Sequence, residues 1–228
     1  MKENKILVFN NKNNIDMNLK IVSLPPIQDS TKSTNDVDID GVDGTLTEFN
    51  KYTSDIKSVE CDYQGNDPDK IVRWLRGKGH VIFGNRADRF YDAEIVNPIP
   101  INQIIENQLY NFLVQFKCQP FGYLLDGQDF SAITNGTILN HNRADYISLP
   151  IITIYGTGSC LVTINNRSFT ITEIGTSITI DSAIQNCYAG KENKINGPYP
   201  YLDIGENLIT WTGTGVTKVE IKPNWRCI

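Results

Sequence analysis

The chain has 228 residues, of which 40% are hydrophobic and 21% are charged, and its formal net charge is -5 at pH 7. A chain of this length can form one large domain or two ordinary ones, each with an apolar core. The acidic balance argues against a general affinity for nucleic acid or anionic membranes, and no segment approaches the roughly 20 apolar residues of a membrane helix.

The N-terminus and the cysteines indicate where the protein folds. The first residues, MKENKILVFNNKN, carry charge without a long apolar run, so we expect no secretory signal. The cysteines are scattered, odd in number and free of the close pairs found in metal sites. We expect reduced, mostly buried thiols in a protein that folds in a cytoplasm. These thiols belong to Cys61, Cys118, Cys160, Cys187 and Cys227.

The stretch from Asn35 to Phe49, NDVDIDGVDGTLTEF, has two interpretations. A calcium loop needs oxygen ligands at its first, third and fifth positions, a glycine at its sixth and a bidentate acid at its twelfth. The twelfth position here is Thr47, and Glu48 comes one step too late. The first half of the pattern is met by Asp36, Asp38, Asp40 and Gly41.

The favoured interpretation of this stretch is a strand that enters a turn. Val37 and Ile39 fit a solvated loop poorly, and neither flank has a helical pattern. Alternation of apolar and acidic residues is typical of a half-buried strand. We therefore expect Val37 and Ile39 to point into a core and the aspartates to point toward water, with no metal ion.

The clearest helix signal is NDPDKIVRWLRGKG. Asn66 or Asp67 can cap the helix, Pro68 suits its first position, and Gly77 suits its end. The helical spacing gathers one apolar stripe, so the helix docks on the rest of the domain. The stripe consists of Ile71, Trp74 and Leu75.

Most of the remaining first half alternates between apolar and polar residues. Residues 81–85 and 89–96 are predicted to be a strand pair, and residues 109–118, LYNFLVQFKC, to be a strand with one apolar face. That face consists of Tyr110, Phe112, Val114, Phe116 and Cys118.

Residues after 126 predict an all-β second domain. CLVTINNRSFTI, residues 160–171, has the pattern of a hairpin with Asn165-Asn166 as its turn. Folding about that turn places Cys160 opposite Ile171, Val162 opposite Phe169, and Thr163 opposite Ser168. SITID, NLITW and TKVEIKP continue the short strands, which suggests a sandwich. We place the domains at residues 1–125 and 126–228.

No set of residues has the pattern of a catalytic site. His80 and His141 belong to no metal-ligand spacing, and no nucleophile elbow or phosphate-binding glycine loop is present. A turn or interface role suits His80 better than catalysis. Asp126 and Asp129 could act in a glycosidase only if the fold set their separation. We expect no enzyme activity, no metal and no cofactor.

The basic residues between 70 and 89 have two interpretations. A solvated helix face and loop is the default, because exposed charge is usual for lysine and arginine. The sharper hypothesis is that this basic zone meets the acidic DVDID segment of a neighbouring copy, where complementary charge would set the register. The residues of this possible ring interface are Asp38, Asp40, Arg73, Arg76 and Arg86.

Aromatic residues near the C-terminus could stack on sugar rings, although core packing explains most such residues. Trp211 lies in an alternating strand, so we expect it in the core. Tyr199 and Tyr201 lie between prolines in the loop NGPYPYLDIG and are the better candidates for a sugar contact.

Over nearly its full length the chain resembles the distal tail proteins of long-tailed phages and phage-like particles. Residues 39–46, IDGVDGTL, resemble the family's turn of glycine and aspartate, in which a basic residue usually stands where Val42 is here. Residues 52–63, 70–95 and 112–124 resemble its helix-bearing segment and closing strand. Residues 198–226 resemble its ending, with a glycine before asparagine and a final Trp225-Arg226.

The resemblance implies a mainly β protein with two domains. The first is a belt β-sandwich with one helix and a β-hairpin, and the second is a galectin-like β-sandwich. The family forms a hexameric ring at the distal end of the tail tube, and the ring joins the tube and tape measure proteins to the tail-tip or baseplate protein. The implied location is the virion tail, after assembly in the host cytoplasm. Val42 lacks the charge usual in the family, which puts any ring contact by this side chain in doubt.

Two other classes of function compete with an assembly role. The chain could be a carbohydrate-binding module that grips wall polysaccharide through Tyr199, Tyr201 or Trp225, although His141-Asn142-Arg143 is too compressed to match the sugar-binding run of true galectins. It could also be a wall hydrolase, which would require at least one indispensable acid.

Overall fold

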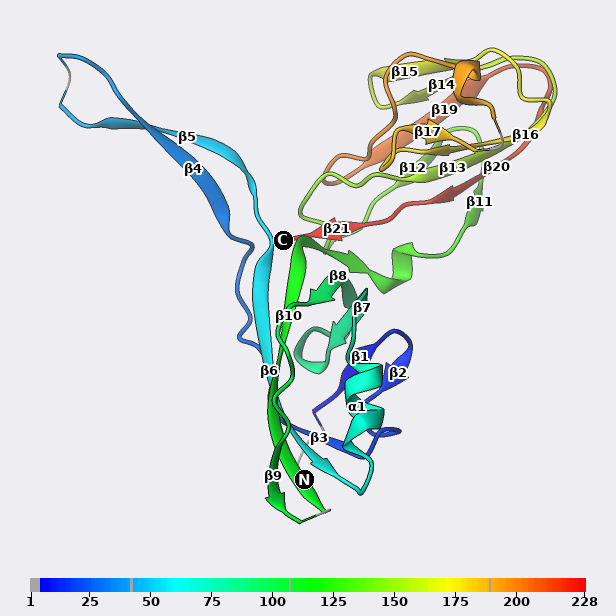
Figure 1. Ribbon diagram of the computed structural model, residues 1–228. Helices are drawn as coiled ribbons and strands as arrows, with labels where there is room; N and C mark the ends of the chain where they lie inside the picture. The colour runs from blue at the N-terminus through cyan, green and yellow to red at the C-terminus, as the bar shows by residue number, and fades with distance from the viewer. Residues whose placement is uncertain (1–4, 42, 107, 189) are drawn as a thin grey trace. The chain divides into compact units, whose positions relative to one another are not determined.

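The computed structural model describes residues 5–41, 43–106, 108–188 and 190–228, which form two compact units (Figure 1). Unit 1 comprises Met1–Gly122 with Ile228, and unit 2 comprises Tyr123–Cys227. The boundary between the units thus falls between Gly122 and Tyr123. The sequence patterns predict it three residues later, between residues 125 and 126. The roles assigned to the two domains stay predictions.

Unit 1 is built on a sheet with the strand order β2-β1-β7-β8-β10-β6-β3, in which β9 also pairs with β10. Its long central strands pair in antiparallel register from Leu109 opposite Gln64 to Cys118 opposite Asp55. The strands are β1 (Leu7–Phe9), β2 (Lys12–Asn13), β3 (Leu19–Ser23), β6 (Asp55–Gln64), β7 (Lys78–Phe83), β8 (Arg89–Ile95), β9 (Asn102–Ile105) and β10 (Leu109–Leu124).

The core of unit 1 lies on one face of this sheet. The predicted alternation of β10 is confirmed, because all five residues of its apolar face are buried. Phe116 is fully buried, and its ring centroid lies 5.5 Å from that of Phe9 and 5.8 Å from that of Phe83. The predicted strand pair is also confirmed as β7 and β8, joined through the 3-10 turn η1 (Gly84–Arg86).

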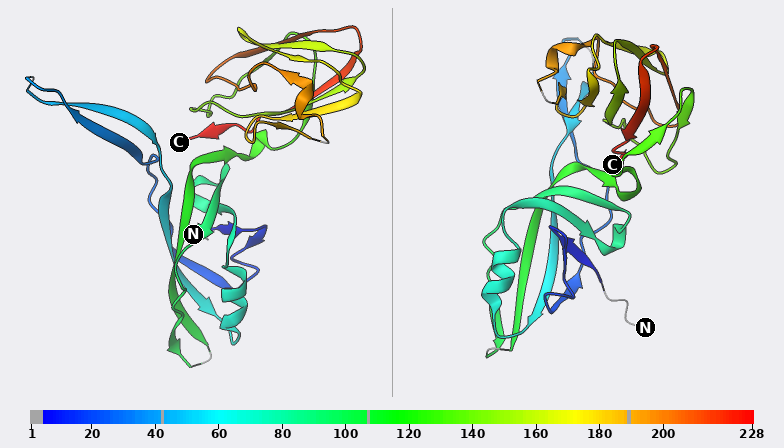
Figure 2. Two further views of the ribbon diagram at one scale, coloured as in Figure 1. Left: turned by 45° about the horizontal axis from the view of Figure 1, so that its top comes forward. Right: turned by 90° about the vertical axis from the view of Figure 1, so that its right-hand side faces the viewer.

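The predicted helix is confirmed as α1 (Pro68–Trp74), which both views of Figure 2 show alongside the strands of unit 1. Asp67 is its N-cap and accepts a hydrogen bond from the Lys70 N–H at 3.2 Å. The predicted apolar stripe is buried, and the Trp74 Nε1–H donates to the Phe9 carbonyl at 3.0 Å. The helix is therefore docked on β1 by both apolar and polar contacts. Among the described residues no helix is long and apolar enough to cross a membrane.

The acidic stretch folds as two strands of a hairpin, β4 (Lys32–Asp38) and β5 (Thr45–Tyr52), which pair with each other and with no other described strand. The predicted strand entering a turn is thus confirmed. The expectation that Val37 and Ile39 point into a core is wrong, since these side chains are 38% and 48% exposed. No layer of the described chain covers either face of the hairpin, so alternation did not imply burial here. Val42 lies outside the described residues.

Unit 2 is a sandwich of two antiparallel sheets, with the strand orders β11-β20-β13-β16-β17 and β12-β19-β14-β15-β18. The last described strand is β21 (Arg226–Cys227), and the turns η2 (Leu125–Gly127) and η3 (Glu192–Lys194) lie between strands. The sheets consist of β11 (Ser131–Ile133), β12 (Thr137–Leu139), β13 (Ile151–Gly156), β14 (Cys160–Ile164), β15 (Arg167–Ile171), β16 (Thr176–Asp181), β17 (Asn186–Cys187), β18 (Ile195–Asn196), β19 (Asn207–Thr212) and β20 (Val216–Lys222).

The hairpin of β14 and β15 has the predicted register at every expected pair. Asn165 has a φ of 54°, the left-handed conformation that a two-residue turn requires and that asparagine tolerates. The residues of the two inner sheet faces form one apolar cluster. Trp211 only partly fulfils its expected core role, because it is half-buried at the edge of this cluster.

All five cysteines are free and buried, as expected for structural thiols. Burial raises the pKa of Cys61 and Cys118 to about 12. These two thiols are therefore fully protonated at neutral pH and poor nucleophiles.

Candidate assembly interface

The hairpin of β4 and β5 presents two chemically different faces. Its register places Val37 opposite Leu46 on one face and Asp36 opposite Thr47 on the other. Because successive side chains of a strand point to opposite sides, Asp38 lies on the face of Asp36. One face thus carries Val37 and Leu46 together with Glu48, and the other carries carboxylates, hydroxyl groups and Phe49.

None of the hairpin residues is buried. An isolated two-stranded ribbon is marginally stable in water, and apolar side chains left in solvent mark interaction surfaces. The base of the hairpin is anchored by the Tyr52 ring, whose centroid lies 5.8 Å from that of Phe121. The exposed apolar residues of the hairpin are Val37, Ile39, Leu46 and Phe49.

The acidic residues of the hairpin are held by few partners. Asp36 accepts a hydrogen bond from Thr47 Oγ1 at 2.7 Å. Asp38 and Asp40, two residues of the predicted interface, are exposed and make no side-chain hydrogen bond or ion pair within the described chain. Nor does any group of three or more His, Cys, Asp or Glu residues within it have the arrangement of a metal site. These carboxylates are available to a cationic partner.

The structure separates the basic residues predicted to form the other half of the interface. Arg73 lies on α1, where it pairs with Asp67 at 3.4 Å, and Arg76 follows the helix in an exposed position. Arg86 is half-buried, and its Nη1 donates to the Tyr91 hydroxyl at 3.1 Å. The small hollow beside Arg86 includes no residue of α1. Arg73 and Arg86 therefore belong to different surfaces.

A basic cleft of about 390 Å³ lies beside α1. It brings Lys12, from β2, together with Lys70 and Arg73 of the helix. Its remaining lining is Asp16, Met17 and Trp74. Lys12 could not be predicted from the sequence patterns, because no local signal near residue 12 indicates that its side chain lies beside α1, about 60 residues later in the chain.

The two tyrosines proposed for a sugar contact have protein partners in unit 2. The Arg167 guanidinium lies 3.7 Å from the centroid of the Tyr201 ring, so one face of that ring is already covered. Tyr199 is half-buried against the core, and its hydroxyl contacts Cys187. Their sugar contact stays a prediction, which loss of selective binding to a glycan array on Tyr201→Ala would test.

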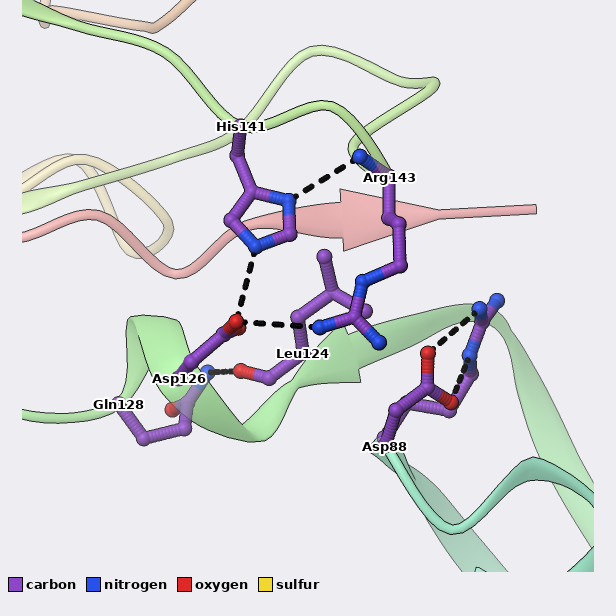
Figure 3. A network of polar contacts seen from close by, with 7 residues as sticks. Asp88, Leu124, Asp126, Gln128, His141 and Arg143 are labelled. Atoms are coloured by element: carbon purple, nitrogen blue, oxygen red, sulfur yellow. Dashed lines mark hydrogen bonds and ion pairs between the residues drawn. The ribbon is translucent and has the colours of Figure 1, made fainter.

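His141 is held within a polar network of unit 2, shown in Figure 3. Its Nδ1 accepts from the Arg143 N–H at 3.2 Å, so its Nε2 carries the proton and donates to Asp126 Oδ2 at 2.9 Å. Arg143 Nη2 donates to the same Asp126 oxygen at 3.1 Å. Both imidazole nitrogens of His141 are thus engaged in hydrogen bonds within unit 2.

The same network predicts a pH-dependent contribution to stability. The hydrogen bond from His141 lowers the pKa of the Asp126 carboxyl below its ordinary value, and Arg143 adds to this effect. A lowered folded-state pKa stabilises the fold at pH values above the ordinary carboxyl pKa of about 4, and this stabilisation is lost as the pH falls through the folded value. Because Asp126 is 51% exposed, the effect is at most about 1 kcal/mol.

Asp126→Asn should therefore lower the thermal midpoint slightly at pH 7, and the difference from the wild type should shrink below about pH 4. Differential scanning calorimetry over a pH series measures this. A difference that stays constant, or grows on acidification, would contradict the assignment.

The fold of this chain is similar to the folds of two phage proteins of known structure. No family model matches the sequence, and no curated protein matches it. The chain is similar to the crystal structure of the Dit (gp 19.1) protein of phage SPP1, described as a paradigm of hub adsorption apparatus in phages that infect Gram-positive bacteria. The TM-score is 0.73 at 11% identity, covering 98% of this chain and 99% of that one.

A second similar chain comes from the phage p2 baseplate in its activated conformation with strontium, with a TM-score of 0.51 and 8% identity over 95% of this chain and 96% of that one. The expected mainly β fold and the resemblance to distal tail proteins are thereby confirmed at the level of the fold.

Proposed function

We propose that this chain is a structural distal tail protein, which forms a hexameric hub at the end of a phage tail tube. The observation that carries the proposal is the fold shared with the SPP1 Dit protein over nearly the whole length of both chains. Its second support is the uncovered hairpin, which exposes the apolar side chains of Val37, Ile39, Leu46 and Phe49 to solvent.

The partner that the hairpin binds is another copy of the same chain. A head-to-tail contact uses one patch on each copy to bind a different patch on the next, and such contacts generate closed rings. Asp38 and Asp40 supply the negative charge of one patch, and Arg73 and Arg76 supply the positive charge of the other. Arg86 supplies a further contact on a separate surface.

The proposed hub joins the tail tube and tape measure proteins to the tail-tip or baseplate protein. Its work is geometric and needs no catalytic group, cofactor, membrane segment or specific contact with nucleic acid. The proposed locations are the host cytoplasm during assembly and the distal tip of the virion tail.

Negative-stain electron microscopy of the purified protein at high concentration tests this function. We expect end-on class averages with six-fold rings and a central channel. A chain that forms no ring, alone or with tail tube protein as a template, would count against a hub. Charge reversal at Arg76 and Arg86 that leaves assembly intact would remove these two residues from the interface.

A further inference from the structure

We propose that the basic cleft beside α1 receives the acidic face of the β4–β5 hairpin of a second copy of this chain. This inference rests on the proposed ring and specifies which surfaces meet in it. The cleft is the one lined by Lys12, Lys70, Arg73, Asp16, Met17 and Trp74.

The cleft carries a surplus of positive charge that the chain itself does not neutralise. Lys12 and Lys70 have no ion pair within the described chain. Arg73 pairs with Asp67 at 3.4 Å, but both side chains are more than half exposed, so this pair is weak and can be exchanged. The single acid on the lining, Asp16, leaves a net charge of about +2 by this count of side chains. An acidic partner is therefore favoured.

The floor of the cleft is apolar and rigid. Trp74 and Met17 are each 6% exposed, and the indole of Trp74 is fixed by its hydrogen bond to the Phe9 carbonyl. A preformed surface costs little conformational entropy when a partner binds. Charges at the rim and an apolar floor fit the acidic face of the hairpin, which carries the exposed Phe49 ring beside its carboxylates.

The spacing of charges on the hairpin fits this cleft. Asp36 and Asp38 point to the same face of β4, about 7 Å apart at the rise of an extended strand. Lys70 and Arg73 stand one helical turn apart, with Cβ atoms about 5 to 6 Å from each other. Their long side chains can bridge the small difference, and Asp40 at the turn would then be left for Lys12.

The hairpin that enters the cleft is that of a second copy. The hairpin and Lys12, Lys70 and Arg73 are all solvent-accessible within one chain, so a chain does not fill its own cleft. Each copy would give one hairpin and receive another, which is the head-to-tail arrangement that closes into a ring. Opposite charge at this contact would fix the register and speed the encounter.

Two charge-reversed variants test the pairing. Asp38→Lys with Asp40→Lys reverses the hairpin, and Lys12→Glu with Lys70→Glu reverses the cleft. All four side chains are exposed, and the matched controls Asp29→Lys and Lys117→Glu reverse exposed charges elsewhere in unit 1. Circular dichroism confirms that each variant is folded.

Sedimentation velocity should show self-association weakened about tenfold or more in each reversed variant and unchanged in the controls. An equimolar mixture of the two variants should recover assembly, because every hairpin then finds a cleft of opposite charge in an alternating ring. In a mixture of ¹⁴N- and ¹⁵N-labelled wild-type chains, carbodiimide cross-links should join Asp38 or Asp40 of one copy to Lys12 or Lys70 of another.

The outcomes separate this inference from the proposed function. If both reversed variants still form rings like those of the wild type, the proposed pairing is overturned and the proposed hub function is left intact. Weakened variants whose mixture recovers nothing also overturn it, as do cross-links between copies that never join the hairpin to the cleft. A wild-type chain that stays monomeric up to its solubility limit and with tail tube protein overturns both.

Discussion

Replacing residues 34–50 with an Asn-Gly turn should abolish self-association while leaving both units folded. Within the described residues the strands of the hairpin pair only with each other and none of their side chains is buried, so their removal takes nothing from either core. The free energy of unfolding should therefore change by less than about 1 kcal/mol. Sedimentation velocity and calorimetry on the same sample measure the two effects. Rings that survive the deletion would contradict a role for the hairpin in assembly.

A milder pair of substitutions separates the apolar face of the hairpin from its charge. Val37→Thr with Leu46→Thr keeps two strand-forming residues but removes the exposed apolar pair. Ile138→Thr with Leu208→Thr is the matched control, since these residues are also directly opposite and exposed in unit 2. We expect only the hairpin variant to weaken self-association.

Asn207→Ala should destabilise unit 2 by about 3 kcal/mol. Asn207 is fully buried, and its Oδ1 accepts from the Asp203 N–H at 2.8 Å. Its Nδ2 donates to the carbonyls of Asp203 and Gly205, both at 3.0 Å. Alanine would leave the groups of this loop without their partner and would create a small cavity. Urea denaturation followed by tryptophan fluorescence measures the loss, because Trp211 and Trp225 both report on unit 2.

Two variants distinguish the loss of these hydrogen bonds from a general effect of replacing asparagine. Asn207→Asp keeps the acceptor but loses both N–H donors, so it should also be strongly destabilising. Asn193→Ala removes an exposed asparagine from the same unit and should be nearly neutral. A neutral Asn207→Ala would show that the loop does not need this side chain.

Local structure could be predicted wherever the required signal lies within one segment. The register of the hairpin at residues 160–171 follows from its turn and from matching alternation on both arms. The buried stripe of α1 follows from the helical period, and its start follows from Asp67 and Pro68. In both cases the residues that decide the structure are neighbours in the chain.

The candidate site could be predicted only in part. The acidic character of the β4–β5 hairpin and the basic character of α1 are visible in the sequence. That Lys12 joins Lys70 and Arg73, and that Arg167 covers the ring of Tyr201, depends on contacts between residues far apart in the chain. No local period signals such contacts.

The sequence by itself determined which side chains share a face, because the periods of helix and strand fix side-chain direction locally. Only the tertiary structure decided which faces are covered. Val37 and Ile39 alternate with aspartates as core residues would, yet they lie in solvent because the chain places no layer over them. Burial depends on packing between distant segments, and for this hairpin we propose that the packing partner is another copy of the chain.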